Sequence, residues 1–175
     1  ADRSTCVLFG DGAGAAVVRA EEGELHPSVA GSDGTMGHVL ACESRVQNDW
    51  QQKEADRKTY IDMDGTAVFK FAVRKMPEMA KSLMTQMHCT EADIDWFITH
   101  QANERIIEAI ARRLKSDIAK FPMNIAECGN TSSASIPILL DEMNRSGQLK
   151  DGQKIIMAGF GAGLSWGAVY MEWHA

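Results

Sequence analysis

The sequence predicts an α/β layered fold, because apolar strands alternate with amphipathic helices along the chain. A short apolar run, Trp96–Thr99, passes at once into a helix over residues 103–114 that carries isoleucines at helical spacing. A longer apolar stripe precedes this pair over residues 64–87, and a serine-rich start predicts a third helix over residues 133–145. Strands that alternate with helices are typical of a sheet covered by helices, so we expect one layered domain.

The overall composition is that of a globular domain and excludes several classes of protein. The chain has 175 residues, of which 45% are hydrophobic and 24% charged, which is enough for one sizeable core. Its net charge of −6 argues against a general nucleic-acid-binding protein. No apolar run approaches the ~20 residues that cross a bilayer, and no targeting pattern opens the chain. We therefore expect a cytoplasmic protein that binds neither nucleic acid nor membrane.

The four cysteines indicate a reducing compartment. Cys6, Cys42, Cys89 and Cys128 lie far apart, without a CxxC pair or a Cys/His spacing suited to zinc. We interpret them as reduced thiols of a cytoplasmic protein and expect no metal site. Cys6 falls in an apolar run and is expected to be a small core residue.

Both ends of the chain carry a glycine-rich segment between apolar runs. In TCVLFGDGAGAAVVRA the runs are residues 5–9 and 15–18, and the glycines lead into a valine-rich strand and not into a helix. A phosphate-binding loop needs a helix N-terminus, so a glycine-rich hairpin is the better interpretation. KIIMAGFGAGLSWGAVYMEW repeats the pattern, with runs over residues 155–158 and 165–173. We expect two strand–turn–strand units in one sheet.

The helices and the loop before them can be placed from their capping and breaking residues. Asp64 is a suitable N-cap for the first helix, and Pro77 inside that helix predicts a kink or a break. The methionines of this region are interpreted as adaptable core residues. Pro137 is allowed in the first turn of the third helix, and Gly147 ends it. Residues 31–59 are polar and lack periodicity, which is typical of a long surface loop with a binding role.

Two polar side chains stand where α/β folds carry chemistry. His100 follows the strand Trp96–Thr99, which places it at the carboxyl edge of the predicted sheet, where such folds bind ligands. Asn130 lies in the turn CGNTSSAS, just before the third helix. Taken singly, His100 could equally be a structural histidine, and Gly-Asn-Thr could be only a turn followed by an N-cap. The residues alone leave both interpretations open.

Four motifs of the chain stand in a highly specific order and spacing. They are DRSTCVLFGDGAGAAVV, HQANERII, GNTSSASIPILLDE and GFGAGLSWGA. Together they resemble the β-ketoacyl-acyl carrier protein synthase III family of thiolase-like condensing enzymes, but only its C-terminal half. The resemblance implies that residues 1–175 form one C-terminal thiolase-like domain, with a mixed five-stranded sheet flanked by helices. The chain begins without a methionine, and we expect the family's N-terminal half to be absent from it.

In that family the active site is a cysteine–histidine–asparagine triad. The matching positions are His100 and Asn130, while the nucleophilic cysteine belongs to the N-terminal half. Cys128 is a poor substitute, because it precedes a turn and not a helix whose N-terminus would lower its pKa. The family's oxyanion-hole loop matches residues 160–163, with the backbone N–H of Ala162 as the donor. The family often has glycine at this position.

The resemblance also implies the reaction. An acyl group passes from acyl-CoA, with acetyl-CoA as the expected donor, to the cysteine. Malonyl-acyl carrier protein then decarboxylates and condenses with it, which initiates fatty-acid synthesis. A neutral imidazole and a carboxamide suit the stabilisation of the enolate oxygen, since neither has to gain a charge. We therefore expect a homodimeric acyltransferase of lipid metabolism that needs no cofactor besides its coenzyme A substrate.

Further positions match the binding surfaces of the family. The residues that match the site for coenzyme A and its pantetheine arm are Arg3, Gly65, Phe69 and Asn103. The residues that match the docking surface for the acidic carrier protein are Lys70, Arg105, Arg112 and Arg113. Each set also has an ordinary interpretation, as helix start, apolar stripe or solvated helix face.

Two alternative functions stay open. The chain could be a thiolase-like partner subunit without catalysis, or a sibling condensing enzyme that uses another acyl donor. The presence of both His100 and Asn130 favours the synthase, because a purely structural subunit has no chemical need for the pair. We expect that the chain alone forms no acyl-enzyme and condenses no substrates. We also expect that it exposes an apolar surface and therefore associates with the N-terminal half of the enzyme.

Overall fold

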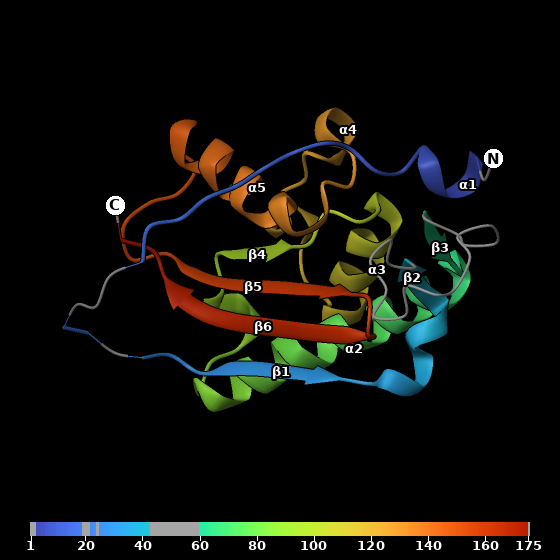
Figure 1. Cartoon of the computed structure of the whole chain (residues 1–175). Coiled ribbons are helices and arrows are strands. Elements are labelled where there is room, and N and C mark those ends of the chain that lie inside the picture. The colour runs from blue at the N-terminus through green and yellow to red at the C-terminus, as the bar shows by residue number, and fades with distance from the viewer. Residues whose placement is uncertain (1–2, 19–21, 24, 43–59, 175) are drawn as a thin grey trace.

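The chain forms a mixed four-stranded sheet with helices on both faces (Figure 1). The computed structural model describes residues 3–18, 22–23, 25–42 and 60–174. The strand order is β1-β6-β5-β4, with bounds of Ser28–Ser32 for β1, Trp96–Thr99 for β4, Lys154–Gly161 for β5 and Ser165–Glu172 for β6. β4 runs parallel to β5, and the other neighbours are antiparallel. The predicted α/β layered fold with a mixed sheet is confirmed.

The helices lie close to their predicted bounds. The α-helices of the described residues are α1 (Arg3–Cys6), α2 (Gly65–Gln86), α3 (Glu104–Leu114), α4 (Ile125–Cys128) and α5 (Ser135–Arg145). Short 3₁₀ helices span Gly34–Val39, Glu91–Asp93, Ile118–Lys120 and Ser132–Ala134. α2, α3 and α5 correspond to the three helices that the sequence predicts.

α2 begins where the sequence predicts and continues past its proline. Asp64 Oδ1 accepts the backbone N–H groups of Thr66 and Ala67, each at 3.0 Å, which makes it the N-cap. The predicted break at Pro77 is absent, since α2 is one helix from end to end. Pro77 is buried with its neighbour Met76, and this packing holds the helix together across the one hydrogen bond that proline cannot make.

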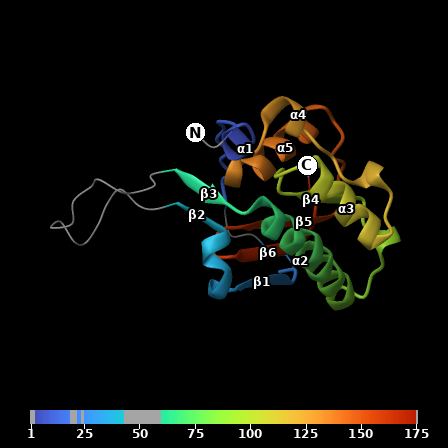
Figure 2. The ribbon, with the colours of Figure 1, turned by 90° about the vertical axis from the view of Figure 1, so that its right-hand side faces the viewer.

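Two hydrophobic cores lie on opposite faces of the sheet. α2 and α3 cover one face (Figure 2), where Leu83 and Ile107 pack with Ile156 of β5. On the other face, Leu139 of α5 packs with Ile98 of β4. Within the described ranges, no helix combines the length and the apolar composition that a membrane span requires.

The N-terminal glycine-rich segment is not the hairpin that the sequence predicts. Residues 10–18 run as extended chain across α5 (Figure 1). The backbone pairs with Asn130 instead: the Gly10 N–H donates to the Asn130 carbonyl, and the Asn130 N–H donates to the Leu8 carbonyl, both at 2.9 Å. A β-carbon at Gly10 would collide with the carbonyl oxygen of Cys128. The glycine therefore permits a close approach to another segment, which an apolar–glycine–apolar pattern cannot distinguish from a turn.

The prediction that Cys6 is a small core residue is wrong, because the predicted strand that would bury it does not form. Cys6 lies in α1 and not in a strand, and its side chain is exposed. Val17 and Val18, which were expected in the second strand of the hairpin, are almost fully exposed as well.

The described part of the sheet has four strands and not five, because the N-terminal glycine-rich segment does not join it. β2 (Leu40–Cys42) and β3 (Ile61–Met63) form a separate antiparallel pair. Residues 31–59 therefore contain more structure than the surface loop that the sequence predicts, since the 3₁₀ helix Gly34–Val39 leads directly into β2. Residues 43–59 lie outside the described ranges.

The parallel pairing of β4 with β5 brings two turns to one edge of the sheet. Thr99 lies opposite Ala158 in the register, and the His100 N–H donates to the Ala158 carbonyl at 2.9 Å. β5 continues to Gly161 and turns into β6, as the predicted C-terminal hairpin does. His100 and the turn after Gly161 therefore lie at the same edge.

We predict that Leu83→Ala lowers the free energy of unfolding by about 2–5 kcal/mol, because it opens a cavity between α2 and the sheet. Leu25 is the matched control, since its side chain is fully exposed. Leu25→Ala should change the same quantity by less than about 0.5 kcal/mol. Denaturant titration measures both variants, and equal losses would contradict the assignment of the core.

Candidate active site

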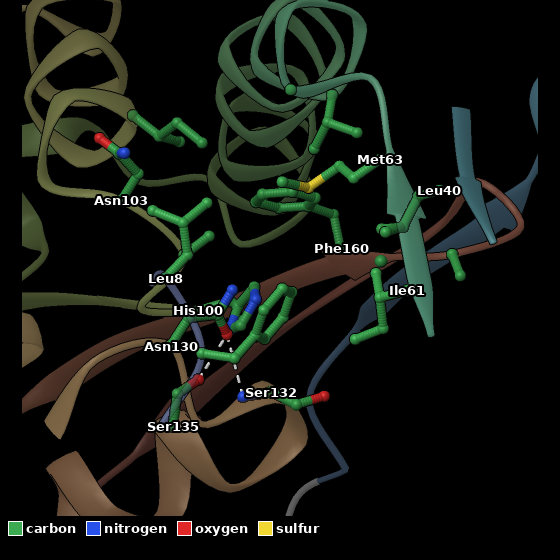
Figure 3. A pocket seen from close by; sticks show the side chains of 18 of the residues that line it. Leu8, Leu40, Ile61, Met63, His100, Asn103, Asn130, Ser132, Ser135 and Phe160 are labelled. Atoms are coloured by element: carbon green, nitrogen blue, oxygen red, sulfur yellow. Dashed lines mark hydrogen bonds between the residues drawn. The ribbon is translucent and has the colours of Figure 1, made fainter. Parts of the chain in front are cut away.

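One cavity lies at the edge of the sheet where β4 and β5 end. Its volume is about 690 Å³, and the starts of α2 and α3, the β2–β3 pair and the start of α5 contribute to its walls. His100 and Asn130, which come from separate turns, both line it (Figure 3). The structure thus brings the two predicted residues to one space.

His100 is held by one hydrogen bond and one aromatic contact. Its Nδ1 lies 2.7 Å from Oγ of Ser135. The Phe160 ring packs against the imidazole edge to face, with centroids 5.5 Å apart and planes at 68°. Burial lowers the pKa of His100 to about 4, so the ring is neutral near pH 7. Because Nδ1 contacts Ser135, Nε2 is the nitrogen left for a ligand.

Asn130 is anchored through both its backbone and its side chain. Its backbone bridges Leu8 and Gly10, and its Oδ1 accepts the backbone N–H of Ser132 at 2.9 Å. Asn130 is buried. With the oxygen of the amide engaged, the two N–H groups are the side that can serve a ligand. Asn130 and neutral His100 are therefore able to hydrogen-bond a ligand without changing charge.

The rest of the cavity is largely apolar. The side chains of Leu40, Ile61, Met63 and Phe160 contribute to its wall (Figure 3). An apolar wall offers water few hydrogen bonds, and hydrogen bonds from fixed donors to a developing charge are stronger where less water competes.

Other predicted positions also reach this cavity. Ala162, in the turn between β5 and β6, lines it, as do Gly65 and Phe69 of α2 and Asn103 before α3. Asn103 is at the same time the N-cap of α3, since its Oδ1 accepts the Arg105 N–H at 2.9 Å. Phe69 is partly exposed and does not belong to the apolar core.

Arg3 is the one predicted binding residue that the structure does not place. Its backbone belongs to α1, and its side chain lies outside the described parts of the chain.

The predicted basic residues lie outside the cavity. Lys70 of α2 and Arg105, Arg112 and Arg113 of α3 are all exposed. Arg112 is close to Glu108, with 3.6 Å between Nη1 and Oε2. Lys70 and Arg105 belong to the starts of α2 and α3, and both of these starts contribute to the wall of the cavity.

The cysteines of the chain differ in their relation to the cavity. Of the four, which all fall in described ranges, only Cys42 at the end of β2 lines it. The Cys128 Sγ lies 3.9 Å from Oε1 of Glu142, and slight burial together with the carboxylates of Glu142 and Glu127 raises the pKa of its thiol. Cys128 is therefore not a poised nucleophile. The described residues contain no group of three or more His, Cys, Asp or Glu side chains that could hold a metal ion.

Sequence reasoning missed several residues of the cavity. Ser135 stands in a serine-rich run that is typical of a helix start, so nothing marked it as the partner of His100. The sequence does not predict the β2–β3 pair, and therefore does not indicate that Leu40, Ile61 and Met63 line the cavity. The parallel register of β4 and β5, which puts Phe160 beside His100, leaves no local signal in the sequence.

Known proteins match the sequence of this chain. The family model described as 3-oxoacyl-[acyl-carrier-protein (ACP)] synthase III C terminal matches residues 84–173, and that described as 3-oxoacyl-[acyl-carrier-protein (ACP)] synthase III matches residues 1–34. The beta-ketoacyl-[acyl-carrier-protein] synthase III of Clostridium novyi (strain NT) is 46% identical over 175 residues, covering 99% of this chain and 54% of the relative. The chain spans about half the length of the curated relatives it matches.

Solved structures match the fold. The 3-oxoacyl-(acyl carrier protein) synthase III from Pseudomonas aeruginosa PAO1 superposes with a TM-score of 0.83 at 38% identity, covering 99% of this chain and 53% of that one. The priming β-ketosynthase from the R1128 polyketide biosynthetic pathway gives a TM-score of 0.74 at 34% identity, covering 84% and 44%. These matches confirm the predicted thiolase-like fold. Since one family model covers more than half of the residues and the relatives match almost all of them, the chain belongs to the 3-oxoacyl-[acyl-carrier-protein] synthase III family.

Proposed function

We propose that this chain is part of a condensing enzyme that joins an acyl group from acyl-CoA, with acetyl-CoA as the expected donor, to malonyl-acyl carrier protein and so initiates fatty-acid synthesis. The observation that carries the proposal is that His100 and Asn130 line one largely apolar cavity. The names of the relatives, which are β-ketoacyl-[acyl-carrier-protein] synthases, support it.

The proposed role of the pair belongs to the second half-reaction. When the malonyl thioester loses CO₂, the electron pair of the broken carbon–carbon bond moves into the thioester, and negative charge develops on its oxygen. Nε2–H of His100 and Nδ2–H of Asn130 donate to that oxygen. Donors fixed in advance stabilise such a charge better than water that must reorient. The enolate carbon then attacks the acyl-enzyme thioester, a carbon–carbon bond forms, and the cysteine thiolate leaves.

We propose that the nucleophilic thiol comes from a segment outside these 175 residues. Cysteine nucleophiles are activated at helix N-termini or beside cations. Cys42 comes from a strand end, and the pKa of Cys128 is raised and not lowered. Acyl transfer to the external thiolate would use the backbone N–H of Ala162 as an oxyanion donor, which the position of Ala162 on the cavity supports.

The walls of the cavity support a binding site for the pantetheine arm. Gly65 leaves open space at the start of α2, since a β-carbon there would meet only the tip of Met63 at 4.0 Å. Phe69 and Asn103 also line the cavity and offer an apolar surface and an amide. Arg3 is assigned to the nucleotide end of coenzyme A by the family resemblance.

The basic side chains of α2 and α3 are proposed to dock the acidic carrier protein. Lys70 and Arg105 near the starts of α2 and α3, with Arg112 and Arg113 further along α3, are exposed positive charges in a chain of net charge −6. Complementary charge speeds encounter and orients a partner, and salt weakens it. Carrier protein bound here would hold its pantetheine arm close to the cavity.

The proposed cofactor requirement and cellular compartment follow from the chemistry of the substrates and the thiols. Decarboxylation supplies the electron pair for the new bond, so the reaction needs no cofactor besides the thioester substrates. The four cysteines, which all lie in described parts of the chain, are not joined by disulfides there, as is usual in the reducing cytoplasm. We also propose a homodimer, as the family resemblance implies.

A second candidate function is a sibling condensing enzyme with another acyl donor. The similarity to a priming β-ketosynthase of a polyketide pathway supports it. Measuring kcat/KM for acetyl-CoA against longer and branched acyl-CoA substrates separates the two, since a fatty-acid-initiating enzyme should prefer acetyl-CoA.

We predict that His100→Ala and Asn130→Ala each slow the decarboxylation of a malonyl thioester by about 10²–10³-fold, because each removes one oxyanion donor. In the native protein, which supplies the thiol, both variants should still form an acyl-enzyme from labelled acetyl-CoA. The exposed residues His174 and Asn144 provide matched controls, and their alanine variants should release CO₂ at the wild-type rate. Decarboxylation at the wild-type rate in His100→Ala would contradict the proposal and favour the interpretation of the chain as a non-catalytic partner subunit.

We predict that the native protein still forms a stoichiometric acyl-enzyme when Cys42 is changed to serine, because the thiolate is supplied from elsewhere. Incubation with radiolabelled acetyl-CoA, followed by denaturation and counting of protein-bound label, measures this. Cys128→Ser serves as the parallel variant outside the cavity. Loss of label in Cys42→Ser alone would assign the nucleophile to this chain.

Reversing one docking charge should affect the carrier protein and not the small substrate. We predict that Arg105→Glu raises KM for malonyl-acyl carrier protein by about three- to tenfold and leaves KM for malonyl-pantetheine unchanged. Lys81→Glu, the same change of charge further along α2, is the matched control. Equal effects of the two variants would contradict the proposed docking surface.

A further inference from the structure

One hydrogen bond of His100 has a direction with a chemical consequence. Nδ1 of the ring lies 2.7 Å from Oγ of Ser135 (Figure 3). A neutral imidazole carries a single N–H proton, so a proton on Nδ1 leaves Nε2 as an acceptor, while a proton on Nε2 makes it a donor. The direction of this bond therefore decides what His100 offers to the cavity.

The surroundings of Ser135 fix that direction. Ser135 is only 2% exposed, and its oxygen already receives the backbone N–H of Gln101 at 3.3 Å. The hydroxyl proton needs an acceptor, because a buried donor without a partner is costly. Among the hydrogen bonds of the described residues, Nδ1 of His100 is the acceptor within its reach. A proton on Nδ1 would instead aim two donors at the serine oxygen and leave the hydroxyl proton without an acceptor.

We propose that Ser135 is a positioning residue that sets the tautomer of His100. Its hydroxyl donates to Nδ1, which keeps the proton of the neutral ring on Nε2 and makes His100 a hydrogen-bond donor toward the cavity. The catalytic meaning of this role rests on the proposed function, in which Nε2–H stabilises a forming oxyanion.

One short segment thereby orients both donors of the cavity. The 3₁₀ helix Ser132–Ala134 leads directly into α5, which begins at Ser135. The Ser132 N–H donates to the side-chain oxygen of Asn130, so the amide N–H groups of Asn130 remain available to the cavity. The Ser135 hydroxyl binds Nδ1 of His100, so Nε2–H remains available to the cavity. Both polar groups are held by their acceptor atoms, so both present donors.

NMR of the native protein with ¹⁵N-labelled histidine tests the proposal without any change at Ser135. Protonated and unprotonated imidazole nitrogens give well-separated ¹⁵N resonances, and the signals of His100 are those lost in His100→Asn. At pH 7 we expect a protonated Nε2 and an unprotonated Nδ1. A protonated Nδ1, with Nε2 either bare or protonated, would overturn the proposal.

Variants then test whether the serine sets the tautomer. In Ser135→Ala we expect both tautomers to be populated, and the kcat for decarboxylation to fall by about 10- to 100-fold. Ser146→Ala is the matched control, since the Ser146 hydroxyl at the other end of α5 donates to the Met143 carbonyl at 3.1 Å. The control should keep the wild-type tautomer and rate. An unchanged tautomer in Ser135→Ala would also overturn the proposal.

The spectra and the kinetics separate this proposal from the proposed function. The ¹⁵N spectra do not depend on turnover. If His100 carries its proton on Nε2 but His100→Ala decarboxylates at the wild-type rate, the positioning role stands and the function is wrong. If the proton lies on Nδ1 while decarboxylation depends on His100, the function stands and the role of Ser135 is wrong.

Discussion

The parallel pairing of β4 with β5 is the constraint on which the site depends. Parallel strands end at the same edge of a sheet, so His100, which follows β4, meets the turn that follows β5 and carries Ala162. The cores on both faces hold this register, because Ile98 is buried on the α5 face and Ile156 is buried on the face of α2 and α3. A slip by one residue would move such side chains to the opposite face of the sheet and carry His100 away from the cavity. Residues that take no part in the chemistry thus fix the place of the histidine.

The proposed chemistry in turn depends on keeping two donors neutral in an apolar space. Burial lowers the pKa of His100 to about 4, since a charged ring would lose its hydration there. A neutral ring and an anchored amide cost little to hold in place before charge develops on a substrate. Phe160 and Met63 add apolar surface to the same space, and a hydrogen bond is worth more beside such surface than in solvent.

The sequence predicts those parts of the fold that local patterns decide. Asp64 caps α2, and the run Trp96–Thr99 is a strand, because capping and apolar periodicity act within a few residues. The hairpin predicted for the glycines around Gly10 is wrong, because the same pattern serves a turn and a close approach to a helix, and only the tertiary partner decides between them. His100 and Asn130 could be named as candidates from their positions and from the family resemblance. Their common cavity follows from strand register, which leaves no local signal.

The central claim is that the imidazole and the carboxamide act on one oxygen. A crystal structure of the native protein with a malonyl thioester analogue that cannot lose CO₂ tests it most directly. The account predicts that the thioester oxygen lies within about 2.7–3.2 Å of both Nε2 of His100 and Nδ2 of Asn130. A bound analogue whose thioester oxygen contacts neither nitrogen, or only backbone groups elsewhere in the cavity, would contradict it.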